Sequence, residues 1–433
     1  MHNKYIIFPA VVLGLALGLG ALVAVSGSPE RADRPAFEGF DDLEKAADSD
    51  NWKLYFPHQY EGWVGTAEMR ETLYGGGGKA EAEGMDIERI DYLQMYPFLK
   101  VNYDGFPFSK GYYRSRGHYH ALNDVVDTKR LPDWDARPAT CLGCKSTDVV
   151  KLQAVHRDNW YAKSFAKVVG DNTIGCLDCH APGDAEVRHA RDWLDEGMAH
   201  GTFNNIDPEG RTDLVCAQCH TNYHFHAETR KVVLPWSTGL HVEAQLEHYD
   251  ADRRSDEWEH PQTGALVAKI QHPEYELYHE GKEVNVHSML GLQCTDCHMP
   301  TARAEDGERY TEHKWTSPLT HVKNTCMDCH RSWGVEGTIE RAEGVQGRVY
   351  RKQNRIGREL ADFIEAVGEA RANGGLDDDT LTRLQAIHRE AQFYWDFIWV
   401  ENSNGFHNWG EAHRVLDNAE ALIKEGMELL NGS

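Results

Sequence analysis

Cys176-Leu177-Asp178-Cys179-His180 is one of four Cys-x-x-Cys-His pentapeptides in this 433-residue chain, and these pentapeptides decide how it folds. The other three have their cysteines and histidine at Cys216, Cys219 and His220, at Cys294, Cys297 and His298, and at Cys326, Cys329 and His330. Two thiols at this spacing add to the vinyl groups of a c-type haem, and the adjacent imidazole becomes the proximal iron ligand. A fifth pair, Cys141 and Cys144, is followed by Lys145. The ten cysteines therefore predict five covalently bound haem c groups, one of them unlike the rest.

Paired cysteines also occur in zinc sites and, in exported proteins, in disulfide bonds. Histidine makes up only 24 of the 433 residues. Chance placement of His after four of five pairs therefore has odds on the order of one in ten thousand, taking this pentapeptide as the specific sign of haem attachment. The pattern favours haem over zinc and over disulfides.

Composition narrows the class of protein further. The formal net charge is -24, with 69 acidic against 45 basic residues. Such a charge argues against nucleic acid as a partner and against a polybasic membrane-binding patch. Five haems spread from residue 141 to residue 330 must be enclosed by the same polypeptide, so we expect one compact haem region rather than several separate domains.

The N-terminus carries an export segment. Residues 5–25 are apolar, Gly-rich and uncharged, and they follow Lys4. As a helix they reach about 32 Å, enough to span a bilayer, while Ala24-Val25-Ser26 resembles a signal cleavage site. A cleaved signal and an inner-membrane anchor both stay open. Either one places the cysteines in the periplasm, where covalent haem attachment occurs in bacteria.

The remaining chain divides by composition. We expect a signal or anchor over 1–28, a polar linker over 29–50, a pentahaem-binding catalytic region over 51–335, and a long-helix region over 336–433 in the same globular unit. Apolar residues recur at helical spacing over about 337–372, 377–399 and 405–430, which predicts three long helices with an N-cap at Asp377–Asp379 and a stop at Gly374–Gly375. The predicted fold is mainly α, a compact multihaem cytochrome c with few short strands. The stripe Leu360, Phe363, Ile364 and Val367 indicates core packing, with a homodimer contact as the second interpretation.

Lysine makes the fifth haem chemically distinct. A haem with two imidazole ligands has no open coordination position, so it passes electrons but does not easily bind substrate. The Lys145 amine can ligate iron only when it is deprotonated in a sheltered site. The competing interpretation is a surface lysine beside a haem whose proximal ligand comes from elsewhere.

One Cys-x-x-Cys-Lys followed by four Cys-x-x-Cys-His resembles the pentahaem, ammonia-forming cytochrome c nitrite reductase family. The similarity extends over about residues 51–430 and includes the segments 116–118, 219–225, 269–275, 311–314 and 405–407. It implies six-electron reduction of nitrite to ammonium at the lysine-ligated haem, fed by four bis-histidine haems. It also implies that Arg130, Tyr223 and His272 surround the bound nitrogen. Arg116 and Arg137 are the rivals of Arg130, because the usual motif around this arginine is altered here.

The resemblance further implies four distal haem ligands and a calcium ion. The distal ligands are His118, His287, His313 and His407, and their pairing with the proximal histidines is not readable from sequence. In many relatives calcium is held by a carboxylate, a tyrosine carbonyl, a lysine carbonyl and a glutamine. Here Tyr223, Lys269 and Gln271 are kept, but Asn222 stands at the carboxylate position. A neutral amide attracts calcium less than a carboxylate does, so Asn222 puts the calcium site in doubt.

The three site residues suit the chemistry expected of them. Nitrite is an anion whose reduction to ammonium consumes six electrons and several protons, so a cationic pocket with proton donors is required. Arg130 supplies fixed charge, His272 orients nitrite and relays protons, and Tyr223 donates a hydrogen bond. The alternatives are a pure electron-transfer cytochrome and a sister reductase of hydroxylamine or sulfite. The expected electron donor is a membrane quinol dehydrogenase or a small cytochrome c.

Overall fold

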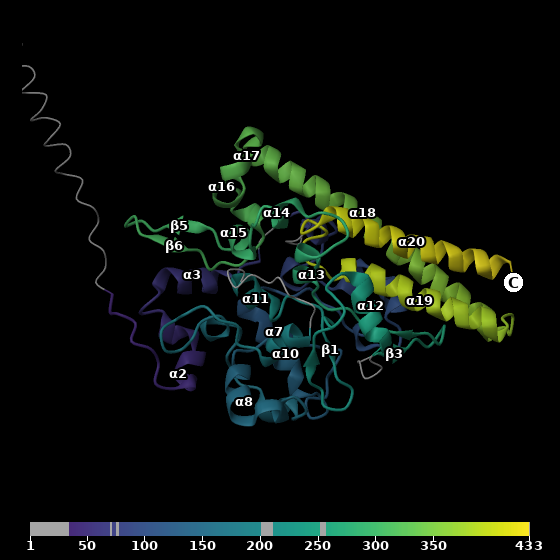
Figure 1. The fold of residues 1–433 in the computed structure, drawn as a ribbon, viewed down its shortest axis with the longest axis horizontal. Helices are drawn as coiled ribbons and strands as arrows, with labels where there is room; N and C mark the ends of the chain where they lie inside the picture. Colours follow the sequence, from purple (N-terminus) through teal and green to yellow (C-terminus); the bar gives the residue numbers. More distant parts are fainter. Residues whose placement is uncertain (1–33, 70–71, 75–77, 201–210, 252–256, 433) are drawn as a thin grey trace, which may run out of the picture.

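The computed structural model describes residues 34–69, 72–74, 78–200, 211–251 and 257–432. Within these ranges the chain is mainly helical, with short helices through most of its length and long ones at its end (Figure 1). The helices are α2 (Leu43–Ala47), α3 (Pro57–Gly65), α4 (Gly78–Ala82), α5 (Tyr92–Met95), α6 (Leu99–Asn102), α7 (Ala121–Val126), α8 (Asp148–His156), α9 (Phe165–Val168), α10 (Asp192–His200), α11 (Arg211–Ala217), α12 (Val242–Ala251), α13 (Glu274–His279), α14 (Val286–Met289), α15 (Cys294–His298), α16 (Val322–Thr325), α17 (Met327–His330), α18 (Gly334–Ala372), α19 (Asp378–Trp399) and α20 (Trp409–Asn431).

The strands of the described residues form three separate antiparallel hairpins. They pair β1 (His224–Phe225) with β2 (Val232–Val233), β3 (Trp258–Glu259) with β4 (Leu266–Val267), and β5 (Thr301–Arg303) with β6 (Arg309–Thr311). None of these hairpins is joined to another. The predicted class, mainly α with few short strands and long C-terminal helices, is confirmed.

The three long C-terminal helices lie where the sequence indicated, although α18 begins three residues earlier and α20 four residues later than expected. The carboxylate of Asp377 accepts a hydrogen bond from the N–H of Thr380 at 2.8 Å, which caps the start of α19. Gly374 has φ +67°, and the N–H of Gly375 donates to the carbonyl of Ala370 at 3.0 Å. This left-handed turn satisfies a carbonyl at the end of α18 and reverses the chain into α19.

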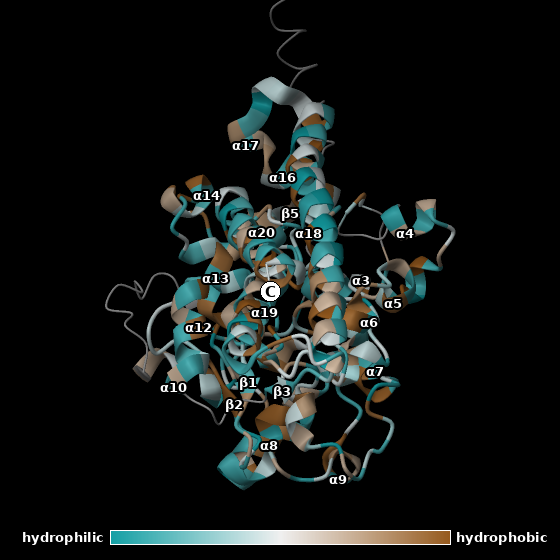
Figure 2. Ribbon diagram, turned by 90° about the vertical axis from the view of Figure 1, so that its right-hand side faces the viewer, coloured by the Kyte–Doolittle hydropathy of each residue, from teal (hydrophilic) through white to brown (hydrophobic). Residues whose placement is uncertain are grey.

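Two apolar cores hold the short and long helices together. The α18 stripe of Leu360, Phe363, Ile364 and Val367 is fully buried, and it packs in a core shared with α6, α12, α19 and α20. The second core is built from α8, α9, α10 and α11 and encloses the cysteines 141 and 144. Figure 2 shows α18 running alongside α19 and α20 and continuing past them toward α16 and α17. The stripe is therefore core, as its first interpretation held.

The part of the predicted linker that the structure describes packs against the protein. Phe37 and Phe40 lie 5.4 and 5.0 Å from Trp52, measured between ring centroids, and the Phe40 N–H donates to the Pro182 carbonyl at 2.8 Å. Helix α2 adds the buried Ala46. The aromatic side chains among the polar residues of 29–50 anchor this segment, so from residue 34 it is not a free linker.

The predicted signal or anchor, residues 5–25, lies outside the described residues. Among the helices of the described ranges, none combines the length and the apolar composition needed to cross a membrane. Helix α18 is long, but it carries charged residues along its exposed side.

Candidate functional site

Each Cys-x-x-Cys pair lies on or beside a single helical turn. The pairs fall in 3-10 turns at Ala139–Leu142 and Cys176–Asp178, at the end of α11, in α15, and around the start of α17. Residues three and four apart on such a turn share one face. The N–H groups of His180, His220 and His330 each donate to the carbonyl of their first cysteine at 2.9 Å, whereas the N–H of Lys145 donates to Leu142 at 2.9 Å. The histidine motifs thus bring two thiols and an imidazole to one side, and the lysine motif turns differently.

Neither disulfides nor zinc accounts for the cysteines. All ten thiols, which lie within the described residues, are free. Two clusters of three potential ligand atoms within 4.8 Å of one another occur in the described ranges, Asp213 with His279 and Cys294, and His58 with Asp306 and Glu308. Neither contains both cysteines of a pair, as a structural zinc site built on Cys-x-x-Cys requires.

The histidines expected as proximal and distal ligands come together in four pairs. Their ring centroids lie 6.0 Å apart for His118 and His220, 6.2 Å for His180 and His313, 6.3 Å for His287 and His330, and 6.3 Å for His298 and His407. A metal–imidazole bond is about 2 Å long, so one iron between two opposed imidazoles places the ring centroids on the order of 6 Å apart. The four spacings fit one iron each, and they supply the pairing that the sequence left open.

Hydrogen bonds fix which ring nitrogen is available in several of these histidines. Nδ1 of His180, His298 and His313 lies 2.8, 3.0 and 2.8 Å from a backbone carbonyl oxygen. A carbonyl only accepts, so Nδ1 carries the proton and Nε2 keeps its lone pair. Burial lowers the pKa of His298 and His313 to about 4, which keeps both rings neutral near pH 7. These are the properties that a metal-ligating imidazole needs.

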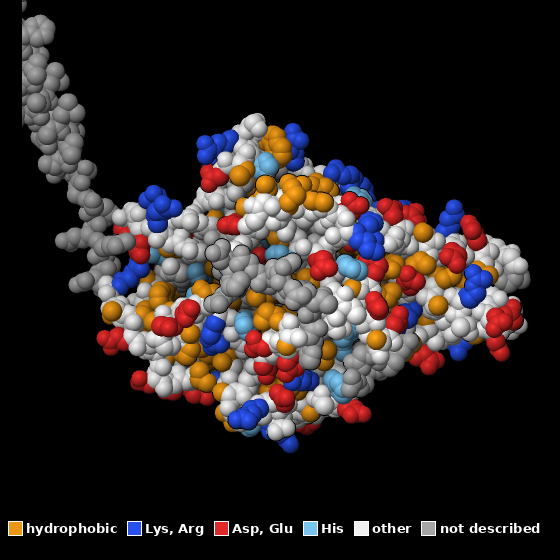
Figure 3. Space-filling view, in the orientation of Figure 1, with side chains coloured by type: hydrophobic (Ala, Val, Ile, Leu, Met, Phe, Trp, Pro, Cys, Tyr) orange, Lys and Arg blue, Asp and Glu red, His pale blue; other side chains and the backbone are white. Residues whose placement is uncertain are grey.

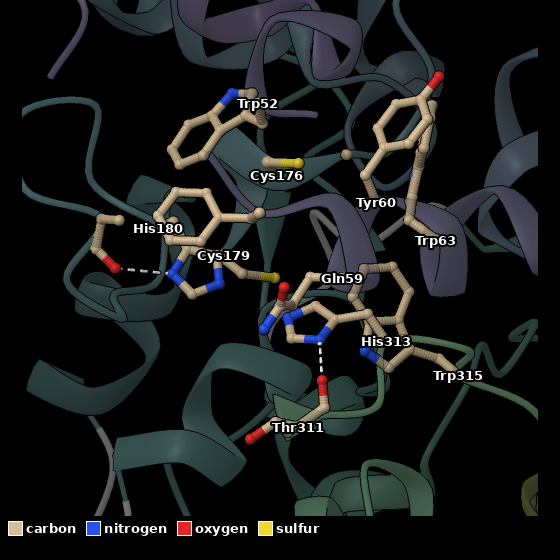
Figure 4. A pocket seen from close by; sticks show the side chains of 13 residues that line it. Trp52, Gln59, Tyr60, Trp63, Cys176, Cys179, His180, Thr311, His313 and Trp315 are labelled. Atoms are coloured by element: carbon tan, nitrogen blue, oxygen red, sulfur yellow. Dashed lines mark hydrogen bonds between the residues drawn. The ribbon is translucent and has the colours of Figure 1, made fainter. Parts of the chain in front are cut away.

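A cavity lies between one of the pairs. It has a volume of about 190 Å³ and is lined mainly by aromatic side chains together with both thiols of the Cys176 motif. Cofactor pockets are mostly apolar, with a few polar groups placed to hold the ligand. Figure 4 shows His180 and His313 projecting into it from opposite sides, with Cys176 and Cys179 along one edge. The side chains present fit a covalently attached haem.

The surroundings of Lys145 differ from those of the histidine motifs. Its side chain is half-buried, and it has no ion pair with a carboxylate of the described residues. Cys141, Cys144 and Tyr223 pack against the same apolar core, and both thiols are close enough to act electrostatically on the Tyr223 phenol. Burial raises the pKa of Tyr223 well above its usual value, so the phenol keeps its proton. The structure therefore brings a potential donor, Tyr223, next to the thiols of the lysine motif.

Arg130 lies in the same neighbourhood. Burial lowers its pKa, and the closest titratable groups acting on it include Tyr112, Cys141 and Tyr223. The guanidinium stacks on Phe108, with 4.2 Å between its central carbon and the ring centroid. It has no ion pair with a carboxylate in the described part of the chain. A half-buried guanidinium without a carboxylate partner is suited to bind an anion.

The two rival arginines are occupied. Arg116 donates from Nε to the carboxylate of Asp124 at 2.7 Å. Arg137 is 2% exposed and donates to the carbonyls of Val125 and Leu131. Both side chains are used in holding the chain, which leaves Arg130 as the arginine with a free guanidinium.

His272 lies next to the Tyr223 segment and to a haem-ligand pair. The N–H of Gln271 donates to Oδ1 of Asn222 at 3.0 Å, which ties the two segments together. The His272 ring centroid is 6.5 Å from that of His220, and its Nδ1 is 3.7 Å from Oε1 of Glu274. The expected site residues come from three separate stretches of the chain. Arg130 and the Lys145 motif lie in the first, Tyr223 in the second and His272 in the third.

The candidate calcium ligands do not fit a calcium ion well. Asn222 is fully buried, and its amide is used at both ends, donating to Gln245 at 2.7 Å and accepting from Gln271. The side chain of Lys269 is a buried cation paired with Asp396 at 3.0 Å. Calcium binds most tightly to charged oxygen ligands, whereas Asn222 provides no charge and its oxygen already accepts a hydrogen bond from Gln271.

Three further residues of this region carry no sequence signal. Glu274 lies between His220 and His272, Asn402 contacts both Glu274 and His272, and Glu401 places its Oε1 2.6 Å from Nδ1 of His407. Glu274 stands in the segment that carries the family resemblance, but nothing in its spacing indicates this contact. Asn402 is 130 residues away from its partner His272.

Comparisons with known proteins agree with this arrangement. The family described as Cytochrome c552 matches residues 48–431. Relatives named cytochrome c-552 are 31% identical over 389 residues in Parabacteroides distasonis, covering 86% of this chain and 74% of that protein, and 33% identical over 377 residues in Bacteroides fragilis, covering 83% and 72%. The solved cytochrome c nitrite reductase of Desulfovibrio desulfuricans, described with two calcium sites, superposes with a TM-score of 0.79 at 25% identity, covering 91% of this chain and 88% of its own.

Proposed function

The chain belongs to the cytochrome c552 family, and on that premise we propose that it reduces nitrite to ammonium, with six electrons, at the haem of the Lys145 motif. The fold shared with a cytochrome c nitrite reductase supports the reaction class. The free guanidinium of Arg130 beside Tyr223 and the lysine-motif thiols is the observation that carries the proposal. It provides a site for an anion where the resemblance expects substrate.

The four histidine pairs are the proposed axial ligands of four electron-transfer haems. His220 and His118, His180 and His313, His298 and His407, and His330 and His287 would each hold one iron, with the cysteines of each motif as the covalent attachment. The spacing near 6 Å and the Nδ1–H tautomers support this assignment. Lys145 is the proposed proximal ligand of the fifth haem, which makes five haem c groups in total.

When bound, the haems would supply the electrons and a Lewis-acidic iron for the reaction. Arg130 holds the negative charge of the substrate and hydrogen-bonds its oxygens as they leave. Tyr223, protonated at all physiological pH values, donates a hydrogen bond, and His272 orients nitrite and passes protons to it. No step is assigned to calcium, because Asn222 makes a poor ligand.

Ammonium yield is the deciding experiment. Purified haem-loaded protein is driven by a reduced viologen with nitrite as the substrate, and near-stoichiometric ammonium is expected. Lys145→His should still attach haem while nitrite turnover falls, because the ligand field of the iron changes. Absence of nitrite consumption in protein of full haem content would point instead to an electron-transfer cytochrome, and faster turnover of hydroxylamine or sulfite would point to a sister reductase.

Location and partners follow from the same proposal. Residues 5–25 would export the chain to the periplasm, where they are either removed or kept as an inner-membrane anchor. Electrons would come from a membrane quinol dehydrogenase or from a small cytochrome c. The mass of the mature N-terminus separates the two fates of the leader, since loss of about 26 residues is expected for a cleaved signal.

A further inference from the structure

Asn402 lies between α19 and α20 and is anchored to Glu274 by two hydrogen bonds. Its backbone N–H and its side-chain Nδ2 both donate to Oε1 of Glu274, at 3.1 and 2.5 Å. A carboxylate only accepts, so the amide atom facing it must be the nitrogen. Glu274 therefore fixes which way the Asn402 amide points.

The same amide nitrogen lies 3.3 Å from Nδ1 of His272. An NH2 group has only hydrogens to offer, so Nδ1 of His272 accepts in this contact. The Glu274 carboxylate is 3.7 Å from the same Nδ1, which is beyond hydrogen-bond distance, so Nδ1 does not donate to it. A neutral imidazole that accepts at Nδ1 carries its proton on Nε2. The nitrogen that faces away from Asn402 and Glu274 is then a hydrogen-bond donor.

We propose that Asn402, oriented by Glu274, is a positioning residue that keeps Nδ1 of His272 as a hydrogen-bond acceptor and Nε2 as a donor, so that His272 donates a hydrogen bond to the oxygens of the bound nitrogen oxyanion. This inference rests on the proposed nitrite reduction. The opposite tautomer would turn the lone pair of Nε2 toward the lone pairs of the substrate oxygen. Asn402 itself does not touch the substrate and acts only through His272.

A double-mutant cycle tests this dependence. kcat/KM for nitrite is measured for wild type, Asn402→Ala, His272→Ala and the double variant, all at equal haem content. Hydrogen bonds to charged groups are among the stronger kinds. Asn402→Ala should lower kcat/KM roughly tenfold, because it weakens the hydrogen bond from His272 to the anionic substrate. In the His272→Ala background the same change should alter it less than about twofold, because the residue through which Asn402 acts is gone.

Asn404→Gly is the matched control. Asn404 belongs to the same loop, contacts Gln353 at 3.3 Å, and has φ +52°, which glycine adopts without strain. This variant should retain kcat/KM within about twofold, since it leaves Asn402 and Glu274 in place. If Asn402→Ala does not accumulate haem-loaded protein, Asn402→Ser takes its place in the cycle.

The outcomes separate the two proposals. A wild-type protein that makes no ammonium removes the proposed function. An active wild type whose Asn402→Ala loss has the same size with and without His272 removes the tautomer role alone, because a merely structural residue lowers the rate in both backgrounds. If Asn402→Ala lowers kcat/KM only when His272 is present, the positioning role is supported.

Discussion

Arg130 is the residue on which the proposed anion binding depends most. Its side chain is half-buried, stacks on Phe108, and has no ion pair with a described carboxylate. Arg130→Ala should lower kcat/KM for nitrite by about 10- to 100-fold, because hydrogen bonds to charged groups contribute about 1.5–3 kcal/mol. Arg130→Lys should recover only part of this loss, because lysine keeps the charge but loses the planar fork. Steady-state kinetics at constant ionic strength measure both.

Arg89 supplies the control for that prediction. It is an exposed arginine in the same part of the chain, paired with Asp127 at 3.6 Å. Arg89→Ala should leave kcat/KM for nitrite unchanged within about twofold. An Arg130→Ala protein with wild-type kinetics and full haem content would show that the anion is bound elsewhere.

The sequence predicted those residues whose spacing along the chain indicates their chemistry. Five Cys-x-x-Cys pairs gave the attachment points, and the family resemblance gave the histidines that the fold assembles into four pairs. The sequence could not pair these histidines, because one such as His407 lies 109 positions after its partner His298 and only folding brings them together. Glu274 and Asn402 escaped prediction for the same reason. A buried glutamate and a loop asparagine look the same in sequence whether or not they orient a catalytic histidine.

At the scale of helices, prediction succeeded where local rules act. The periodicity of α18, α19 and α20, the Asp377 cap and the Gly374 stop are properties of neighbouring residues. It failed for residues 34–50, where Phe37 and Phe40 pack on Trp52 although the segment is polar on average. Two aromatic side chains are enough to hold this segment against the protein although most of its residues are polar. Whether a segment packs depends on its individual contacts, not on its average polarity.

The packing of α20 on α18 depends on a glycine. A Cβ on Gly426 would lie 2.5 Å from a ring carbon of Phe363, which is fully buried in α18. Gly426→Ala should destabilise the protein by about 1–3 kcal/mol through overpacking. Gly344→Ala in α18 is the comparison, because its Cβ would meet only the end of Arg348 at 3.9 Å. It should be neutral or stabilising by up to about 1 kcal/mol. Denaturant unfolding followed by far-UV circular dichroism compares the two.

A second link between helices depends on pH. Glu243 in α12 lies 2.6 Å from Arg414 in α20 and 3.1 Å from Lys282. Burial alone would raise its pKa, but hydrogen bonds from Arg414 and Lys282 outweigh burial and lower the pKa from 4.5 to about 2. A depressed carboxyl pKa stabilises the fold above the unfolded value, and the contribution disappears as pH falls from about 5 to about 2.

Glu243→Gln should therefore destabilise the protein at neutral pH by at most about 3 kcal/mol, less whatever solvent screening removes. The difference from wild type should shrink as the pH is lowered below about 4.5, because wild type then loses the same ion pair. Glu428→Gln, whose exposed carboxylate is 3.9 Å from Lys424, should change stability by less than about 0.5 kcal/mol at any pH. If the difference in unfolding free energy between wild type and Glu243→Gln stays constant with pH, Glu243 stabilises the fold through packing and not through charge.

At the scale of the whole molecule, an apolar patch stands out on an acidic protein. Val284, Met289 and Leu290 are 68 to 69% exposed around α14. Trp333, at the start of α18, stacks on His330, whose ring lies 6.3 Å from that of His287 in α14. Figure 3 shows orange side chains gathered near α14 and α17, at the end of the molecule where α18 begins. Exposed apolar patches mark interaction sites, and the proposed occupant is a second copy of the chain.

Two copies with a net charge of -24 each repel one another at low ionic strength. The proposed homodimer must therefore depend on apolar contact, and its dissociation constant should fall as salt shortens the Debye length to about 8 Å near 0.15 M. Sedimentation equilibrium at that salt should give about twice the mass of one haem-loaded chain, whose polypeptide alone is 49.1 kDa. Leu290→Asp should shift the protein to monomer while nitrite turnover is retained, since the patch contains none of Arg130, Tyr223 and His272. A wild type that stays monomeric at high salt contradicts the dimer, and a Leu290→Asp protein that stays dimeric moves the interface to another face.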